Sequence, residues 1–299
     1  MGLSIAQLYA AIEPVERKWF GIGQKAHKAQ FSKIAKVASV DSPIREFAEA
    51  AGPGQFQLKV ENQAMQVRTV QLGAPRRVQA ATYAAAITIS REAVSDLKQN
   101  MRKITTAAGA LGRSSEQTPE YLFQLMMDRS HTTGYNVTVD NLPLCSTAHI
   151  TPYGVTYSNT LAVPAALSET SLEDIKTALR QTIGPDGMLA PVMPEMLIVP
   201  PALANLAQKL STSEKTLGSA NNDPSVVQGM KWMSFDYLTN QTRFFVKTDA
   251  DNGFYWDWRE EATFERDQIA LTMQAIFIAF FRAMWGAEDP RCVYASNAS

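Results

Sequence analysis

Apolar side chains occupy every second position in two neighbouring stretches of the chain, which is typical of half-buried strands. The alternation predicts a hairpin whose strands meet at a polar turn near residues 61–63; its apolar positions are Phe56, Leu58, Val60, Val67 and, after a shift in phase, Val70 and Leu72. Gly and Pro residues at 52–54 and 73–75 set the hairpin off from the rest. A two-stranded hairpin cannot bury both faces alone, so we expect this one to lie on a neighbouring molecule.

The next segments alternate between strand and helix periodicity. Residues 83–90 predict a strand, and apolar residues at 3–4 spacing from Val94 to Leu111 predict a long helix. Gly109, Gly112 and two serines predict a break in this helix at 109–115. Thr118 and Pro119 suit the first positions of a new helix.

The second half of the chain mixes short strands and helices. Residues 196–199 predict a buried strand that ends at Pro200-Pro201 and turns at once into an amphipathic helix. Ser171 predicts the start of another helix, which runs through Ile183 and closes at Gly184-Pro185. Alternation resumes at 254–258, a long apolar run covers 270–285, and residues 289–294 predict a turn and a last short strand.

The first 50 residues differ from the rest. An amphipathic stretch that includes Trp19 and Phe20 is interrupted by Pro14, Gly21 and Gly23. The apolar residues are too few for a separate core, so we expect an arm. Residues 1–40 hold six of the 28 basic residues and only two of the 29 acidic ones. Such a basic arm could pair with a neighbour or an acidic partner, or simply form a solvated helix face.

Composition favours a protein that associates with copies of itself. Charged residues make up 19% of the chain, below the roughly 25% of average soluble domains, so surface is expected to be hidden against other subunits. The net charge of −1 argues against a dedicated nucleic-acid binder. No signal-peptide pattern starts the chain, and the longest apolar run is too short for a bilayer and contains Arg282. We therefore expect no membrane partner.

Catalytic chemistry has one weak candidate. Cys145 and His149 lie four residues apart and could form a thiolate–imidazole pair on a helix. Pro143 and Pro152 favour a loop there, and ordinary packing of a buried cysteine is the better interpretation. The three histidines are scattered, and the KTDADNG segment lacks the ligand spacing of a calcium loop. Nucleotide-binding glycine motifs are also missing, so we expect no enzyme activity, metal or cofactor.

The order of these segments resembles the major capsid proteins of tailed bacteriophages with the Hong Kong 97-type fold, nearest the major head subunits of Mu-like phages. The resemblance spans essentially the whole chain and is carried by Asp186-Gly187, Pro194 to Leu203 with its LIVPPAL sequence, Asn221 to Gly229, and Asp289 to Tyr294. It implies an α+β fold with an N-terminal arm at 1–52 and an extended hairpin loop at 53–82. A peripheral domain with a spine helix and long strands would comprise 83–140 and 253–299, and an axial domain 141–252.

The function implied by the resemblance is structural. The chain would assemble as hexamers and pentamers into an icosahedral head that encloses double-stranded DNA without sequence-specific contact. It would be located in the virion after assembly in the cytoplasm of a bacterial host. Portal and separate scaffold or decoration proteins would be partners. Some relatives form a covalent Lys–Asn link between subunits, but nothing in the sequence pairs Lys59 with Asn297, and we predict no such link.

The candidate contacts between subunits lie on the hairpin and the arm. They are Phe56, Leu58, Lys59, Val67, Arg68, Arg76, Arg77, Trp19 and Phe20. The basic pair at the base of the hairpin could clamp acidic side chains of a neighbour. Two alternatives stay open: a shell protein of an encapsulin-like nanocompartment, which shares the fold, and a cysteine-dependent hydrolase that uses Cys145 and His149.

Overall fold

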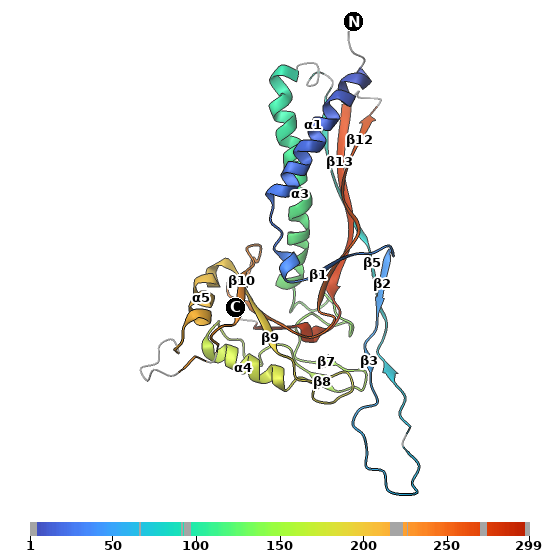
Figure 1. The fold of residues 1–299 in the computed structure, drawn as a ribbon, viewed down its shortest axis with the longest axis vertical. Coiled ribbons are helices and arrows are strands. Elements are labelled where there is room, and N and C mark those ends of the chain that lie inside the picture. The colour runs from blue at the N-terminus through green and yellow to red at the C-terminus, as the bar shows by residue number, and fades with distance from the viewer. Residues whose placement is uncertain are drawn as a thin grey trace.

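The computed structural model describes residues 5–65, 67–90, 92, 97–215, 224–225, 227–269 and 274–296. Within these ranges the chain is elongated, with two four-stranded sheets, a pair of long helices beside one sheet, and a loop that extends far from the body (Figure 1). The predicted positions Val94, Asn221, Ala270 and Asn297 lie outside the described residues.

The first sheet has the strand order β1-β12-β13-β6. β1 (Lys36–Ser39) runs parallel to β12 (Phe254–Ile269), β12 pairs antiparallel with β13 (Gln274–Ala287), and β13 pairs antiparallel with β6 (Ala81–Ile89). Every second residue of β13 is buried from 275 to 281, because one face of the sheet is covered by helices. The strands predicted at 83–90 and from 254 onward are confirmed.

Two long helices, α1 (Ile5–Ala26) and α3 (Leu97–Asp128), lie side by side along this sheet (Figure 1). Their apolar stripes meet β12 and β13 in one buried cluster, where the rings of Phe20 and Phe264 are 5.1 Å apart. α3 is the predicted long helix. The amphipathic pattern at 3–4 spacing therefore identifies the face that packs.

The predicted break at 109–115 is wrong, because α3 continues through both glycines. A Cβ atom at Gly112 would lie 2.2 Å from the carbonyl oxygen of Phe20, and one at Gly23 would lie 2.1 Å from that of Gly109. These glycines let the backbones of α1 and α3 approach closely, which a side chain would prevent. Packing energy outweighs the weak helix propensity of glycine here.

The arm predicted for residues 1–52 is in fact part of the body over much of its length. After α1, the short helix η1 (Phe31–Lys33) buries Phe31 against Trp256, with ring centroids 4.9 Å apart. Glu120 of α3 accepts a hydrogen bond from the backbone N–H of Phe31 at 3.0 Å. β1 then joins the first sheet. Residues that lacked a core of their own use the core built by α3 and β12.

The second sheet has the strand order β10-β9-β11-β14. Its strands are β10 (Lys231–Ser234), β9 (Pro194–Val199), β11 (Phe244–Thr248) and β14 (Val293–Ser296). The predicted strand at 196–199 is β9, and the helix after Pro200-Pro201 is confirmed as η2 (Pro201–Leu203) followed by α5 (Ala204–Thr212). α4 (Glu169–Arg180) packs with α5 against the sheet.

Two predicted boundaries in this half differ from the structure. α4 begins after Ser168, which accepts a hydrogen bond from the N–H of Ser171 in a capping box, so Ser171 is the third helical residue and not the cap. The last strand, β14, follows the short helix η3 (Pro290–Cys292) and pairs with β11. The end of the chain therefore belongs to the second sheet, although the sequence grouped it with the first.

One buried cluster connects the two sheets. It includes Ile198 and Phe245 of the second sheet, Trp256 and Phe281 of the first, and Phe123 of α3. Because this core is continuous, the two sheets pack as one body. Three shorter pairings of described strands lie outside them: β7 (His149–Ile150) with β8 (Thr156–Tyr157), and two pairs of strands that carry the extended loop.

Candidate subunit interface

The extended loop is held by two short ladders at its base. β2 (Ile44–Phe47) pairs with β5 (Arg76–Gln79), and β3 (Ala50–Ala51) pairs with β4 (Gln71–Leu72). Beyond these ladders the described residues from 52 to 70 form no strand, and the chain reverses at a turn where Asn62 has φ 65°. The predicted polar turn is correct, but the predicted strands at 55–60 and 67–70 do not form. Neither arm of the loop has a buried face within the chain that would favour strand pairing.

The loop carries a row of apolar side chains that the chain itself leaves uncovered. Every described residue from Gln55 to Leu72 is exposed. Phe56, Leu58 and Val67 are 91%, 92% and 91% exposed. The other large apolar members of the row are Val60, Met65, Val70 and Leu72. A monomer that exposes this much contiguous apolar surface has an interaction site there.

Polar residues of the loop fall into two groups. Lys59 and Arg68 are exposed beside the apolar row, and Arg68 donates to the carbonyl oxygen of Pro53 at 3.2 Å. At the base, the guanidinium of Arg76 donates to the carbonyl oxygens of Asn136 and Thr138, the latter at 2.7 Å. Burial lowers the pKa of Arg76. This arginine therefore anchors the loop to its own body, which corrects its prediction as a contact to a neighbour.

Arg77, the other half of the predicted basic clamp, stays at the surface. Its Nε donates to Glu46 across the β2–β5 ladder at 3.0 Å, and both side chains are largely exposed. An exposed pair of this kind contributes little to stability. Arg77 is therefore free to exchange Glu46 for an acidic group of a neighbour, whereas Arg76 is committed within the chain.

The two predicted contacts on the arm, Trp19 and Phe20, differ in their exposure. Trp19 is 41% exposed on α1, whereas Phe20 is 4% exposed and packs on Phe264. The prediction of Phe20 as a subunit contact is corrected by this burial, because the ring is already covered by its own sheet. Trp19 remains a candidate. Helical periodicity explains the difference, since consecutive residues are about 100° apart around the axis.

A buried polar network connects the loop base to the second sheet. Arg291, whose side chain is 3% exposed, donates to the carboxylate of Glu49 at 2.6 Å and to the carbonyl oxygen of Ile183 at 2.7 Å. Its guanidinium also lies 4.3 Å from the centre of the Tyr157 ring. Burial raises the pKa of Glu49, and the neighbouring Arg291 opposes that rise. Glu49 immediately precedes β3, so this pair sets the position at which the loop leaves the body.

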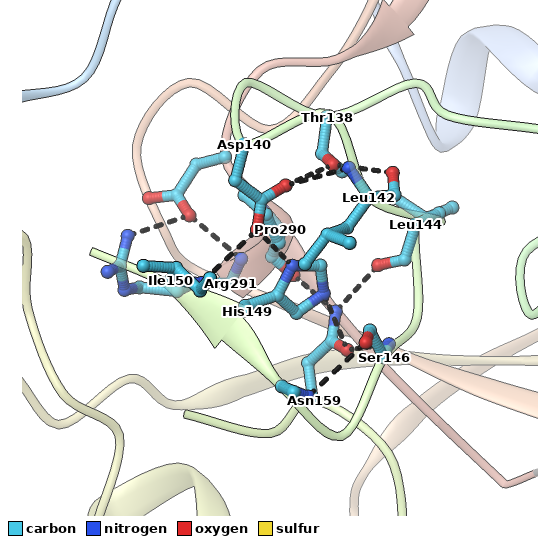
Figure 2. A network of polar contacts seen from close by, with 12 residues as sticks. Thr138, Asp140, Leu142, Leu144, Ser146, His149, Ile150, Asn159, Pro290 and Arg291 are labelled. Carbon is cyan, nitrogen blue, oxygen red and sulfur yellow. Dashed lines mark hydrogen bonds and ion pairs between the residues drawn. The ribbon is translucent and has the colours of Figure 1, made fainter. Parts of the chain in front are cut away.

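The second part of the network centres on His149 (Figure 2). Its Nδ1 lies 2.6 Å from Asp140 and its Nε2 lies 3.1 Å from Oδ1 of Asn159. The amide of Asn159 donates to the carbonyl oxygens of Leu144 and Pro290, at 2.7 and 2.9 Å. Burial alone would raise the pKa of Asp140, but its bond to His149 lowers it. The network ties the 138–159 segment to the chain end just before Arg291.

This geometry does not form the Cys145–His149 pair. Both ring nitrogens of His149 face Asp140 and Asn159 instead of sulfur. Cys145 is fully buried, and its burial raises the thiol pKa to about 12. A thiol so hard to ionise is a poor nucleophile. Among the described residues there is also no group of three His, Cys, Asp or Glu side chains that could hold a metal ion, and no helix combines the length and hydrophobicity that crossing a bilayer requires.

Sequence reasoning missed the residues that hold the loop base. Glu49, Asp140, Asn159 and Arg291 are widely separated along the chain, and only folding brings them together. The sequence offered one signal for this network, the Asp289-Pro290-Arg291 segment before the last strand. Arg291 stands there between apolar residues, which suggests that it is buried in an ion pair. Its partner could not be identified without the tertiary structure.

Comparisons with known proteins agree with this architecture. The phage capsid protein family model matches residues 73–296, and no curated protein sequence matches the chain. The procapsid of bacteriophage JBD30 is 11% identical over 98% of this chain and 75% of that chain, with a TM-score of 0.53. The capsid of a native GTA particle is 12% identical over 91% of this chain and 92% of that chain, with a TM-score of 0.57.

A third similar structure is a virus-like particle. The virus-like particle from Pyrococcus furiosus is 10% identical over 94% of this chain and 97% of that chain, with a TM-score of 0.51. At these identities the structural matches show the fold alone, whereas the family model covers most of the sequence and favours a phage head over a nanocompartment. The chain therefore belongs to the phage capsid protein family and is a major capsid protein with the Hong Kong 97-type fold.

Proposed function

We propose that the chain assembles as hexamers and pentamers into an icosahedral head around double-stranded DNA, and that its extended loop is the main contact to a neighbouring subunit. The observation that carries the proposal is the row of exposed apolar side chains on the loop, led by Phe56, Leu58 and Val67 at 91–92% exposure. Their exposure on a segment so far from its own core has a physical explanation only if another molecule covers them.

The energetics of this contact are favourable once it is repeated. Burying one such side chain contributes about 1.5–3 kcal/mol, so three of them contribute about 5–9 kcal/mol per loop. Association of two proteins costs about 4–15 kcal/mol in lost freedom, and a single loop contact is therefore weak. Each subunit of a shell is held by several neighbours at once, which makes the combined binding strong.

The parts of the fold have separate roles in this proposal. The extended loop at 53–82 reaches a neighbour. The first sheet with α1 and α3 forms a peripheral domain, comprising residues 5–39, 83–140 and 253–287. The second sheet with α4 and α5, together with β14, forms an axial domain that meets its copies at the centre of a capsomer. The Glu49–Arg291 pair at 2.6 Å supports a defined loop direction, because it joins the loop base to the axial sheet.

Loop substitutions test the proposal directly. Phe56→Ser with Leu58→Ser should leave a folded subunit that no longer forms closed shells in negative-stain electron microscopy. The matched control is Gln55→Ser with Gln57→Ser, at alternate positions of the same segment, which should still form shells. Circular dichroism checks the fold of both variants. Shells of normal size and yield from the apolar variant would refute the role of the loop.

The partners beyond the capsid protein itself remain predictions. Portal, scaffold and decoration proteins, assembly in the host cytoplasm and the Mu-like affinity are inferred from the resemblance. Nuclease-protected DNA inside purified shells would support the phage head, and enzyme cargo without DNA would support the nanocompartment. The absence of catalytic activity is likewise proposed, on the buried Cys145 and on His149 paired with Asp140 and Asn159.

A further inference from the structure

The exposed charged side chains described on the two long helices of the peripheral domain share one sign. Every exposed charged side chain described on α1, on α3 and between residues 27 and 36 is basic: Arg17, Lys18, Lys25, Lys28, Lys33, Lys36, Arg102, Lys103 and Arg113. The acidic residues of the same segments are buried or half-buried, as Glu16 and Glu120 are. We call this surface the basic helical face.

The opposite side of the first sheet carries charges of both signs. On β12, Phe264 points toward α1 and is buried, so its neighbours Glu265 and Asp267 point away from the helices. Both are exposed, and they pair with Ile278 and Ile276 of β13. Arg282 of β13 lies on the same side as Ile276 and Ile278, so the strand side is mixed in charge. The helices therefore form the more basic side of the domain, although the whole chain has a net charge of only −1.

Helix geometry places the basic residues away from the core. On α1, Lys18 and Lys25 lie about 180° around the axis from the buried Glu16. On α3, Arg102 and Arg113 lie on one side, about three turns apart, and Ala108 between them is buried. Since α1 and α3 lie side by side along the sheet (Figure 1), both rows contribute to one surface.

We propose that the basic helical face lines the interior of the shell and contacts the phosphate backbone of duplex DNA. This inference rests on the proposed function, because it requires a closed shell that holds DNA. A basic surface without a defined pocket suits phosphates, which carry no sequence information.

The spacing of the basic residues limits the strength of this contact. Lys18 and Lys25 are about 10 Å apart along α1, and Arg102 and Arg113 about 16 Å apart along α3. Phosphates recur about every 3.4 Å along each strand of the DNA axis, so each subunit can neutralise only a few of them. Many weak contacts hold the DNA in place as a whole, yet each one breaks easily while DNA moves into the head.

A duplex-binding assay with unassembled subunits tests the surface. The face variant combines Lys18→Gln, Lys25→Gln and Lys103→Gln, and the control combines Arg180→Gln, Lys209→Gln and Lys231→Gln, which are exposed residues of the axial domain. Fluorescence anisotropy of a labelled duplex of about 30 base pairs is recorded from low to high salt. The face variant should lower the salt slope by about 0.9 for each phosphate that it no longer neutralises, and the control should match wild type. Equal slopes for all three proteins overturn the proposal.

A labelling experiment tests which way the face points. The chain's two cysteines, Cys145 and Cys292, are fully buried, so Lys25→Cys introduces the one accessible thiol. A polymer-linked maleimide should label this variant in dissociated subunits and not in closed shells. Labelling of closed shells at the rate of free subunits overturns the inward orientation. Electron microscopy of the same samples separates two outcomes. If the wild type forms no shells, the proposed function is refuted. If shells form but the binding and labelling results contradict the expectation, only this inference is refuted.

Discussion

Glu16 is a carboxyl group buried between α1 and the first sheet without a bonding partner. Its side chain is 0% exposed, and neither carboxylate oxygen accepts a hydrogen bond in the structure. Arg266 pairs instead with Glu13 at 3.4 Å. Burial raises the pKa of Glu16 from 4.5 to about 8, and Arg266 only partly opposes this rise. The folded chain therefore keeps Glu16 protonated at neutral pH.

This shift makes the stability of the subunit depend on pH. In the unfolded chain Glu16 ionises at its ordinary pKa of 4.5, whereas in the folded chain it keeps its proton up to about 8. The stabilising contribution is complete below pH 4.5 and is lost as the pH rises through about 8. At about 1.36 kcal/mol per pH unit, the loss amounts to about 5 kcal/mol. Such a loss is comparable with the net stability of a typical domain.

Replacing the carboxyl group by an amide removes the pH dependence. Glu16→Gln has nearly the same shape but cannot ionise, so it should unfold at higher urea concentration than wild type at about pH 8.5. At about pH 5 the two proteins should differ by less than about 1 kcal/mol, because this pH is only about half a unit above the ordinary pKa of Glu16. The measurement is urea unfolding of unassembled subunits at both pH values, followed by tryptophan fluorescence.

A matched variant distinguishes the effect of burying a carboxyl group from the effect of removing one negative charge. Glu13→Gln removes the same charge one turn earlier on α1, where the side chain is 30% exposed and paired with Arg266. It should give only a small part of the gain at alkaline pH, because burial is the largest cause of the raised pKa of Glu16 and the charge of Glu13 is a smaller one. Equal urea midpoints for wild type and Glu16→Gln at both pH values would refute the reasoning, since the buried carboxyl group would then have no raised pKa.

Three further predictions follow from close packing and burial. Gly23→Ala places a methyl group 2.1 Å from the carbonyl oxygen of Gly109 and should lower the free energy of unfolding by about 1–3 kcal/mol in urea titrations, whereas Gly21→Ala has open space and should not. Arg291→Ala removes a buried ion pair and should cost about 3–5 kcal/mol; a variant as stable as wild type in thermal unfolding would contradict this. Cys145 should not react with a thiol reagent in the native subunit and should react after urea unfolding, and rapid modification of the native thiol would revive the hydrolase hypothesis.

Local patterns were sufficient to predict many of the elements. The 3–4 spacing along α3, the strand and Pro-Pro turn that lead from β9 into α5, and the alternation on β12 all appear in the structure as expected. Each of these patterns records which side of one element is apolar, and that side is buried in the fold. The resemblance carried by the LIVPPAL and DPR-x-VY segments led to the family that the comparisons then showed.

The errors occur where two distant segments meet. Gly109 and Gly112 were predicted to end a helix, but they face α1 and allow the two backbones to touch. Arg76 was predicted to reach a neighbour, but the carbonyl oxygens of Asn136 and Thr138 already accept its hydrogen bonds. In both cases the residue type indicated a special role. The partner that gives the residue this role is distant in the sequence, so no local pattern identifies it.

The sequence by itself determined the type and order of the elements, the exposed apolar row of the loop and the concentration of basic residues near the start. These properties depend on the period of apolar positions and on charge, which are local. Only the tertiary structure decided that residues 5–39 belong to the body, that Glu49 meets Arg291, and that the exposed charged side chains described on α1 and α3 are all basic. Such contacts join residues up to hundreds of positions apart, and their energy depends on distances that exist only after the chain has folded.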